Sequence, residues 1–517
     1  MGIMSASETS VVSSQTTIRS VSPSTGALVG EAPVMDGAQV REAVARARAA
    51  QIAWGSMAVQ DRAATLLKYR DALVQRTEAL VELIVRETGK PRHEALLHEV
   101  GEAADLITYY AKNGPRMIAP REVPLRLLRH RRSYLHYAPR EVIGVIAPWN
   151  FPLVIPLSGV IPALLSGSAA VLKPSEATTM IGLEMKMIWD RAGLPADLFT
   201  VVTGYADTAK ALIDSDIQMV HFTGSVGNGR KVAAACAERL IPSILELGGK
   251  APLIACEDAD LELTANNAVY GAFANAGQIC ISVERLYAHQ DIHDALVERI
   301  VAATQRLKQD DPESGWVDVG AMTVARQMDV LDELVADALD KGAVLRAGGR
   351  RASRKGQFYL PTIITGCDHR MRVMNEELFG PVLPIMKVES DERAVELANS
   401  LPLGLNAYLF SANPQRARKL AERVEAGSVL INDVLTNYAS PEVPFGGVKN
   451  SGIGRVHGEQ ALQDMCELRH VSYDRVRPLR KNPFGFPYTA RRFRWMLRGL
   501  RTLFSGGDVL QKLSDLL

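Results

Sequence analysis

The chain has few cysteines, and nothing in their spacing suggests that they pair. Its five cysteines within 517 residues are odd in number and widely separated, with no CxxC and no Cys/His spacing typical of a metal site. This pattern argues against a disulfide framework and predicts reduced thiols in a reducing compartment. We expect no metal site.

The chain also lacks a long hydrophobic run and a strong net charge. Its longest apolar stretch, FPLVIPLSGVIPALLSGSAAVL, is interrupted by prolines, glycines and serines, so no membrane-spanning helix is expected. The first residues lack the basic and apolar segments of a signal peptide, and Ala6 breaks the myristoylation pattern. The formal net charge of +1 gives no reason to expect nucleic acid. We therefore expect a soluble, cytoplasmic protein with a short disordered leader.

The order of sequence patterns predicts an α/β fold. The length of 517 residues is typical of two or three domains. Residues 36–113 show the apolar spacing of helices, and Gly89 before Lys90 and Pro91 marks a helix end. From residue 141 onward, β-branched runs alternate with helical segments, which is typical of βαβ units on a parallel sheet.

Two turns after predicted strands could hold a phosphate and a ribose. In MVHFTGSVGNGRK, the glycines and Ser225 would bring backbone amides at a helix start close to a phosphate. In VLKPSEAT, Lys173 and Glu176 follow a strand end and suit ribose hydroxyls. Taken singly, each turn is better explained as an ordinary tight turn or a surface charge pair, but two such turns after successive strands favour a ligand site.

The cysteine in GAFANAGQICIS, Cys280, has no histidine or second cysteine beside it. Free cysteines are among the most buried residues, so these residues alone leave a core thiol and a nucleophile both open. The other four cysteines are expected to pack in the core.

Seven short motifs along the chain, taken together in their order, indicate a resemblance to a known family. They are PWNFP at 148–152, KPSE at 173–176, FTGS at 222–225, ELGGK at 246–250, GQIC at 277–280, EELFGPV at 376–382 and PFGGVKNSGIGR at 444–455. Over about residues 17–475 the chain thereby resembles the aldehyde dehydrogenase superfamily, in its non-acylating, NAD(P)-dependent form.

The resemblance implies a domain plan. It has a Rossmann-like NAD-binding domain at 17–119 and 141–246 and a second α/β catalytic domain at 247–445. A small β element for oligomerisation follows from 120–140 and 463–477, so a homodimer or homotetramer is expected. A leader at 1–16 and a basic amphipathic tail at 478–517 complete the plan.

The resemblance also assigns catalytic residues. Cys280 would attack an aldehyde as a thiolate, and the adduct would pass through a thiohemiacetal to a thioester. Asn150 matches the family's side-chain donor to the oxyanion, with the Cys280 backbone N–H as the second donor. Glu246 matches the family's general base, which would activate water for release of the acid and would also help to deprotonate the thiol.

The expected cofactor is NAD. The residues that would bind it by resemblance are Lys173, Glu176, Gly224, Ser225, Glu377, Phe379 and Trp149. The carboxylate of Glu176 would accept hydrogen bonds from ribose hydroxyls and repel a 2′-phosphate, which favours NAD, whereas Lys173 would tolerate the phosphate and leaves NADP open.

The substrate is expected to be an aliphatic or aromatic aldehyde. Ile279 and Ile281 flank the thiol, and Val154, Leu157 and Tyr438 are expected at the entrance, with no arginine among them. The alternatives are a succinate-semialdehyde-type dehydrogenase, a thioester hydrolase that needs no NAD, and a membrane-recruited scaffold with little catalysis.

The tail is strongly basic and helical in pattern. Between Arg475 and Gly507 there are nine lysines and arginines and no acidic residue. The apolar residues at helical spacing are Phe493, Met496, Leu497, Leu500, Leu503 and Phe504. Such a helix could lie on the inner membrane face, pack on a neighbouring subunit, or cap its own subunit.

Overall fold

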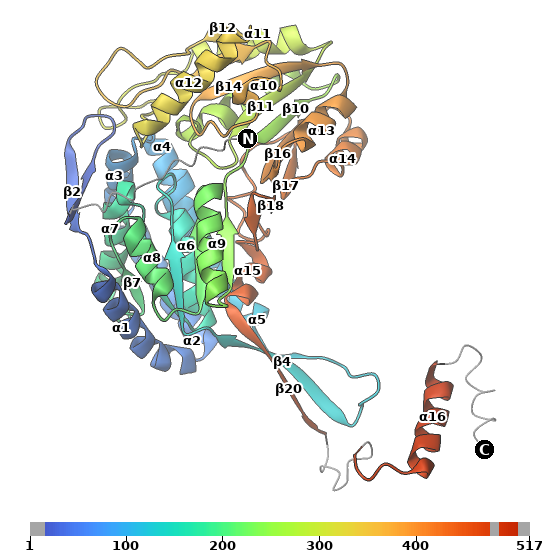
Figure 1. Ribbon diagram of the computed structural model, residues 1–517. Coiled ribbons are helices and arrows are strands. Elements are labelled where there is room, and N and C mark those ends of the chain that lie inside the picture. The colour runs from blue at the N-terminus through green and yellow to red at the C-terminus, as the bar shows by residue number, and fades with distance from the viewer. Residues whose placement is uncertain (1–15, 476–484, 505–517) are drawn as a thin grey trace, which may run out of the picture. The chain divides into compact units, whose positions relative to one another are not determined.

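The computed structural model describes residues 16–475 and 485–504, which form two compact units (Figure 1). The larger unit contains residues 16–119 and 136–469, and the smaller contains 120–135, 470–475 and 485–504. The predicted leader, except residue 16, and much of the predicted tail lie outside the described residues. No helix within the described ranges is long and apolar enough to cross a membrane.

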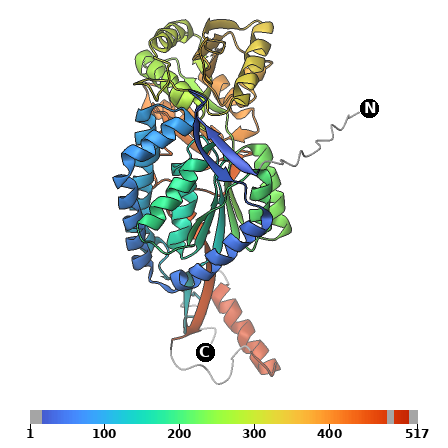
Figure 2. The ribbon, with the colours of Figure 1, turned by 90° about the vertical axis from the view of Figure 1, so that its left-hand side faces the viewer.

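A six-stranded sheet with the order β19-β9-β8-β5-β6-β7 organises the first part of the larger unit. Its parallel strands are β5 (Val142–Ile146), β6 (Ala169–Lys173), β7 (Phe199–Val201), β8 (Met219–Thr223) and β9 (Ser243–Glu246), with β19 (Gly452–Ile453) antiparallel to β9. The strands are apolar runs because helices cover them (Figure 2).

The helices of this part pack on the sheet or on one another. Those in contact with the strands are α1 (Gly37–Ser56), α6 (Val154–Ser166), α7 (Thr179–Arg191), α8 (Ala206–Asp214) and α9 (Val226–Glu238). The others are α2 (Val59–Gln75), α3 (Thr77–Thr88), α4 (Arg92–Glu94), the π-helix η1 (Ala95–Gly101), α5 (Glu102–Met117) and the 3-10 helix η2 (Glu176–Thr178). These elements confirm the predicted helical region at 36–113. A hairpin of β1 (Thr17–Val21) and β2 (Leu28–Pro33) precedes them.

A seven-stranded sheet with the order β12-β13-β14-β11-β10-β16-β17 organises the second part. Its strands are β10 (Ala251–Ala255), β11 (Val283–His289), β12 (Val344–Ala347), β13 (Thr362–Thr365), β14 (Val382–Val388), β16 (Asn406–Phe410) and β17 (Ser428–Ile431). All pair in parallel except β12. The α/β fold class predicted from the sequence is therefore confirmed.

The second part contains further helices and two short strands. The helices are α10 (Leu261–Phe273), α11 (His293–Gln305), α12 (Arg326–Asp340), α13 (Asp391–Asn399), α14 (Pro414–Ala421) and the 3-10 segments η3 (Ala274–Gly277) and η4 (Arg372–Met374). The helix α15 (Gly458–Asp464) follows later in the chain and packs on α5 and α6 of the first part. The strands β15 (Leu403–Gly404) and β18 (Val448–Lys449) pair with each other.

The smaller unit contains strand residues and one helix. A three-stranded sheet with the order β20-β4-β3 is formed by β3 (Arg121–Glu122), β4 (Arg131–Pro139) and β20 (Cys466–Asp474). The helix α16 (Ala490–Phe504) confirms the helical pattern of the tail. The domain boundaries and the oligomerisation role of the strands stay predictions.

Four of the five cysteines are buried and free, as predicted for core residues. They are Cys236, Cys256, Cys367 and Cys466. Cys280 is partly exposed.

A buried ion pair joins the helical region to the start of α6. Lys90 Nζ lies 2.7 Å from Glu99 Oε1, and both side chains are fully buried. Glu99 Oε2 accepts hydrogen bonds from the backbone N–H groups of Leu153 and Val154, each at 3.0 Å. Lys90 Nζ also donates to the Asn150 carbonyl oxygen at 2.8 Å. The pair therefore holds residues 150–154 in place.

We expect Glu99→Ala to lower the free energy of unfolding by about 3–5 kcal/mol, because it leaves the buried Lys90 ammonium without its partner. Calorimetric Tm measures the loss. Glu31→Ala is the matched control, since Glu31 forms an exposed pair with Arg19 and its removal should leave Tm nearly unchanged. Equal Tm values for the two variants would contradict a stabilising role of the buried pair.

Candidate active site

Cys280 follows a backbone segment with an unusual conformation. Asn275 and Ala276 have φ values of 49° and 53°, and Gly277 has a φ of 74°. A Cβ on Gly277 would lie 2.2 Å from the Gly380 carbonyl oxygen, so only glycine fits there. Left-handed non-glycine residues cluster at functional sites, where the surrounding structure holds them.

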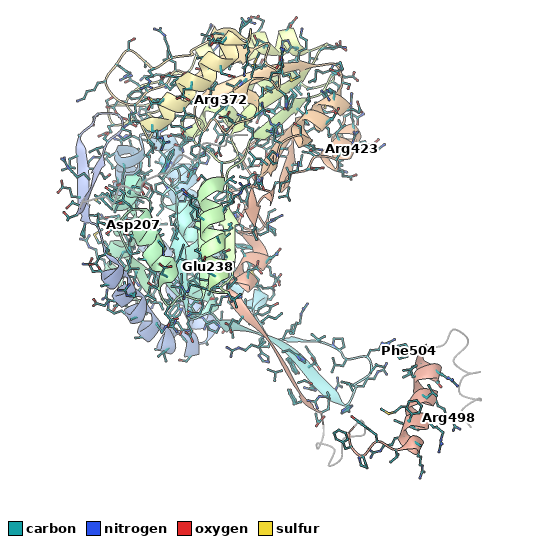
Figure 3. All side chains as sticks on the ribbon, in the orientation of Figure 1. Asp207, Glu238, Arg372, Arg423, Arg498 and Phe504 are labelled. Atoms are coloured by element: carbon teal, nitrogen blue, oxygen red, sulfur yellow. The ribbon has the colours of Figure 1, made fainter. Side chains whose placement is uncertain are left out.

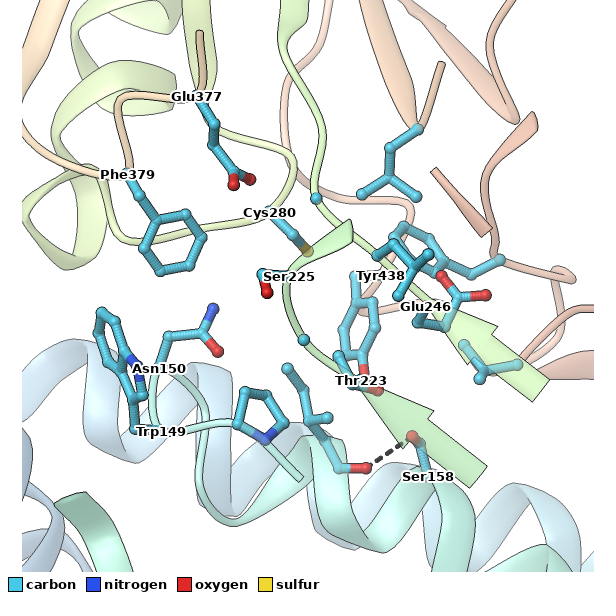
Figure 4. A pocket seen from close by; sticks show the side chains of 18 of the residues that line it. Trp149, Asn150, Ser158, Thr223, Ser225, Glu246, Cys280, Glu377, Phe379 and Tyr438 are labelled. Atoms are coloured by element: carbon cyan, nitrogen blue, oxygen red, sulfur yellow. Dashed lines mark hydrogen bonds between the residues drawn. The ribbon is translucent and has the colours of Figure 1, made fainter. Parts of the chain in front are cut away.

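A cavity of about 350 Å³ brings together residues from distant parts of the chain. Asn150 follows β5, Glu246 ends β9, Cys280 follows η3, and Glu377 and Phe379 precede β14. Figure 4 shows these side chains around one space, with the Asn150 amide and the Cys280 thiol both directed into it. The structure thus places every catalytic residue expected from the sequence in one cavity.

The amide of Asn150 is positioned by a small hydrogen-bond network. Asn150 is buried, and its Nδ2 donates to the Gln278 carbonyl oxygen at 3.0 Å. Asn275 Nδ2 donates to the carbonyl oxygens of Asn150 at 3.1 Å and Gln278 at 3.2 Å. An amide carries two N–H donors, so the second N–H of Asn150 stays available to a bound oxygen.

Glu246 is buried without a hydrogen-bond partner for either carboxylate oxygen among the described residues. Burial raises the pKa of this carboxyl well above its usual value, and Arg455 offsets the effect only in part. A Cβ on Gly446 would lie 2.7 Å from Glu246 Oε1, so Gly446 leaves room for this side chain. An unpartnered buried carboxylate in a cavity is a candidate for proton transfer.

The surroundings of the Cys280 thiol favour its protonated form. Burial, followed by the nearby carboxylates of Glu246 and Glu377, raises the pKa of Cys280 to about 12. Burial also raises the pKa of Glu377 to about 8, with Glu284 adding to the effect, while its Oε1 accepts the Gly249 N–H at 3.2 Å. Perturbed pKa values in one cavity mark a functional site.

A second cavity, of about 610 Å³, lies beyond the carboxyl ends of β5, β6 and β8. Lys173, Ser175 and Glu176 line it, and Lys173 Nζ lies 3.4 Å from Glu176 Oε2. The residues that it shares with the first cavity are Pro148, Trp149, Thr223, Gly224 and Ser225. The two cavities adjoin through these residues. The end lined by Lys173 and Glu176 and the end lined by Cys280 therefore belong to one elongated site.

The glycine-rich turn leads directly into α9. Ser225 caps this helix, and its hydroxyl accepts the Asn228 N–H at 3.4 Å. A Cβ on Gly229 would lie 2.3 Å from Leu247 Cδ2, whereas a Cβ on Gly227 would meet nothing within 4 Å. Gly229 is therefore needed for close helix packing, whereas a side chain at position 227 would have room.

Trp149 and Phe379 face each other across the first cavity. Their ring centroids are 5.4 Å apart at an interplanar angle of 87°. Phe379 adopts a φ of 47°, and its N–H donates to Glu284 Oε1 at 2.8 Å. The carboxylate of Glu284 also lies 3.1 Å from the buried Lys250 Nζ.

A third cavity, of about 120 Å³, is lined mostly by apolar residues, and Cys280 forms part of its wall as well. Its apolar lining comprises Phe151, Ile155, Tyr270, Ala274, Ile279, Ile281, Val434, Leu435, Tyr438 and Ala439. It shares Ile155, Cys280 and Tyr438 with the first cavity, so Cys280 stands where the two meet.

The entrance prediction is wrong for two residues. Val154 and Leu157 are buried in the hydrophobic core, while Ile155 and Ser158 line the first cavity together with Tyr438. The apolar run of α6 is buried on nearly every side, so its spacing could not show which residues face the cavity.

The third cavity also has polar residues that the sequence analysis missed. Glu94, His98 and Glu102 recur every fourth residue and line it. His98 Nδ1 lies 3.0 Å from Glu102 Oε1, and its Nε2 lies 2.9 Å from the Tyr270 hydroxyl. Glu94 accepts the Asn275 N–H at 2.9 Å. The four-residue spacing was the available signal, but it showed only a helix face.

We expect iodoacetamide to alkylate Cys280 slowly at pH 7 and faster as pH rises toward 10, because only the thiolate reacts. Glu246→Gln should move this profile to lower pH, since it removes a nearby carboxylate that raises the pKa of the thiol. Peptide mass spectrometry measures the rate, with the four buried thiols as internal controls. Slower alkylation of the variant at pH 7 would instead show that Glu246 accepts the thiol proton.

Comparison with known proteins assigns the chain to a family. The model of the "Aldehyde dehydrogenase family" matches residues 11–471. A protein of Methylomonas sp. named 4,4'-diapolycopene aldehyde oxidase is 37% identical over 504 residues, which cover 96% of this chain and 93% of that protein. A putative succinate-semialdehyde dehydrogenase [NADP(+)] of Mycolicibacterium smegmatis is 35% identical, covering 87% of this chain and 88% of that protein.

Solved structures agree with these relatives. The crystal structure of an NAD-dependent aldehyde dehydrogenase from Sinorhizobium meliloti is 36% identical, with a TM-score of 0.86 over 90% of this chain and 92% of that one. The NAD+ complex of an aldehyde dehydrogenase from Bacillus cereus is 31% identical, with a TM-score of 0.86 over 89% and 94%. The chain belongs to the aldehyde dehydrogenase family, which confirms the resemblance drawn from its motifs.

Proposed function

We propose that this aldehyde dehydrogenase oxidises an apolar aldehyde to the carboxylic acid with NAD, using Cys280 as the nucleophile. The observation that carries the proposal is the position of Cys280, where an apolar cavity meets the cavity that contains Glu246 and Asn150. An aldehyde entering from one side and a cofactor from the other would meet at this thiol.

The chain's own residues account for the acyl-transfer steps. The Cys280 thiol gives up its proton and adds to the carbonyl carbon, which forms a thiohemiacetal. The oxyanion accepts hydrogen bonds from the second Asn150 N–H and the Cys280 backbone N–H. When bound, NAD supplies the acceptor for the hydride whose departure converts this adduct into a thioester.

Glu246 completes the cycle as general base. Its carboxylate takes a proton from a water molecule, the hydroxide adds to the thioester, and Cys280 leaves as the thiolate while the acid is released. The raised pKa of Glu246 brings its proton affinity closer to neutral, which suits a group that both takes and returns a proton. A glutamate without fixed partners is also free to reorient between thiol and water.

The residues present fit a dinucleotide. Lys173 and Glu176 would hold the adenosine ribose, and Gly224 and Ser225 would offer the start of α9 to the pyrophosphate. Three further residues would hold the nicotinamide end of the dinucleotide, with Glu377 on its ribose and Trp149 and Phe379 beside the ring. Glu377 has a raised pKa and a single backbone donor, so its remaining oxygen is free for a ribose hydroxyl.

We infer a preference for NAD over NADP. Glu176 is half-exposed at the end of β6, with its carboxylate close to the Lys173 ammonium. A second anion in the form of a 2′-phosphate would be repelled by Glu176, although Lys173 could pair with it.

The direct test is absorbance of NADH at 340 nm with the purified chain and a panel of short and long aliphatic and aromatic aldehydes, assayed with NAD and with NADP. We expect activity with NAD that falls at least about 10⁴-fold in Cys280→Ala, because the covalent route is lost. Cys236→Ala is the control for loss of a thiol outside the site. Binding of NAD without turnover of any aldehyde would favour the scaffold alternative, and hydrolysis of thioesters without NAD would favour the hydrolase.

The lining of the third cavity favours aldehydes without a second charge. Its walls are apolar except near Glu94, His98 and Glu102, and no lysine or arginine lines it. His98, the one basic side chain there, already contacts Glu102 and Tyr270. A substrate carboxylate would lose its water and gain no free cation, which is costly. An apolar aldehyde also agrees with the relative named for 4,4'-diapolycopene aldehyde, and less with those named for succinate semialdehyde.

We expect kcat/KM for the methyl ester of 4-oxobutanoate to exceed that for 4-oxobutanoate itself. Ala439→Arg, which places a cation at an exposed lining position, should raise kcat/KM for the anion about tenfold and leave the ester unchanged, since one nearby opposite charge is worth about 1–2 kcal/mol. Ala439→Gln is the neutral control. A preference of the native enzyme for the anion would contradict the proposal of an apolar substrate and would favour the succinate-semialdehyde alternative.

We further propose a homodimer or homotetramer that works in the cytoplasm. Within the described residues β20 is hydrogen-bonded on one side only, and its Leu468, Val471 and Tyr473 are exposed. An unpaired edge strand with apolar side chains is a template for pairing with a second copy. The subunit number follows directly from light scattering.

A further inference from the structure

Helix α16 presents an apolar face that the described residues leave largely uncovered. None of its residues is buried, and the side chains of Phe493, Trp495, Leu500, Leu503 and Phe504 are each more than half exposed. Except for Trp495, these residues fall on one side of the helix together with Met496 and Leu497. Soluble proteins seldom leave such a stripe without a partner.

All charged residues of α16 are basic, and most of them lie away from the apolar face. The helix carries five arginines, Arg491, Arg492, Arg494, Arg498 and Arg501, and no acidic residue. Figure 3 shows its side chains and labels Arg498 and Phe504. Arg492 is tied to its own segment, because it donates to the carbonyl oxygens of Gly485 at 2.8 Å and Pro487 at 3.0 Å. The other four guanidiniums make no ion pair with the described residues.

The loop between β3 and β4, in the same unit, has the same chemistry. Leu127 and Leu128 are exposed and lie between Arg126 and Arg129. The Arg126 guanidinium lies 5.1 Å from the centre of the Phe504 ring, so the loop and α16 are neighbours. The described residues of this unit contain eleven arginines against two acidic residues, Glu122 and Asp474.

From this combination we propose that α16 and the 123–130 loop dock the enzyme on an anionic lipid surface. Apolar side chains of an amphipathic helix enter the boundary between headgroups and acyl chains, while arginines on the flanks pair with phosphate groups. A long, flexible arginine also lets its stem lie on apolar surface with its charge in the headgroup layer. A second subunit would need a surface of many carboxylates to match eleven arginines, whereas an anionic membrane presents that charge without a specific partner.

The docking would bring the enzyme to the phase in which an apolar aldehyde dissolves. That consequence rests on the proposed function, but the docking itself does not. Binding to lipid can therefore be measured without any substrate, and failure of either proposal leaves the other standing.

The test is co-sedimentation of the full chain with vesicles of phosphatidylcholine alone and with 30% phosphatidylglycerol, at about 50 and 500 mM salt. We expect binding to the anionic vesicles only, weakened at high salt. The triple variant Arg494→Gln, Arg498→Gln, Arg501→Gln and the double variant Phe493→Ser, Leu500→Ser should each weaken it at least tenfold. The triple variant Arg299→Gln, Arg350→Gln, Arg423→Gln removes three exposed arginines of the larger unit and should bind as the native chain does.

Two results would overturn the proposal. One is a native chain that stays in the supernatant with anionic vesicles at low salt. The other is a Phe493→Ser, Leu500→Ser variant that still sediments with the vesicles but has a smaller mass by light scattering, which would assign the apolar face to a second copy of this chain. Activity on a short, water-soluble aldehyde should be equal in all variants, which shows that they fold.

Discussion

The active site depends on a buried charge pair that is not part of the chemistry. Lys90 and Glu99 come from the helical region before the first sheet, yet their polar atoms end on the backbone of Asn150, Leu153 and Val154. Both side chains are buried, so removing one of them would leave the other charge without a partner inside the protein and would destabilise the fold. The loop that carries Asn150, the proposed oxyanion donor, is thereby fixed against a helix end rather than left to solvent.

The electrostatics of the site reflect a compromise between burial and reactivity. Cys280, Glu246 and Glu377 share one cavity, and burial raises the pKa of all three. A raised pKa favours the protonated thiol, whereas the thiolate is the nucleophile. A positive charge brought close to the sulfur would favour the thiolate.

Two cavities meet at the Cys280 sulfur, and we propose that one receives the aldehyde and the other the cofactor. The cavities that meet at Cys280 share only Ile155, Cys280 and Tyr438, so the two cavities have largely independent walls. With the aldehyde in the third cavity and the cofactor in the first, as proposed, the residues that line the third cavity can differ with the substrate without changing those that bind the dinucleotide. The polar residues Glu94, His98 and Glu102 line only the third cavity, which is the one proposed to receive the aldehyde.

The sequence by itself determined the α/β class, the helical region, the buried thiols and the motif residues, because these follow from local periodicity and from short patterns that adjoin strand ends. It could not determine which side of α6 faces the cavity, since a helix that is apolar all round gives no period, and so Ile155 and Ser158 took the places expected for Val154 and Leu157. It could not show the Lys90–Glu99 pair or the His98–Tyr270 contact either. Those depend on the packing of segments up to 172 residues apart, which only the tertiary structure brings within hydrogen-bond distance.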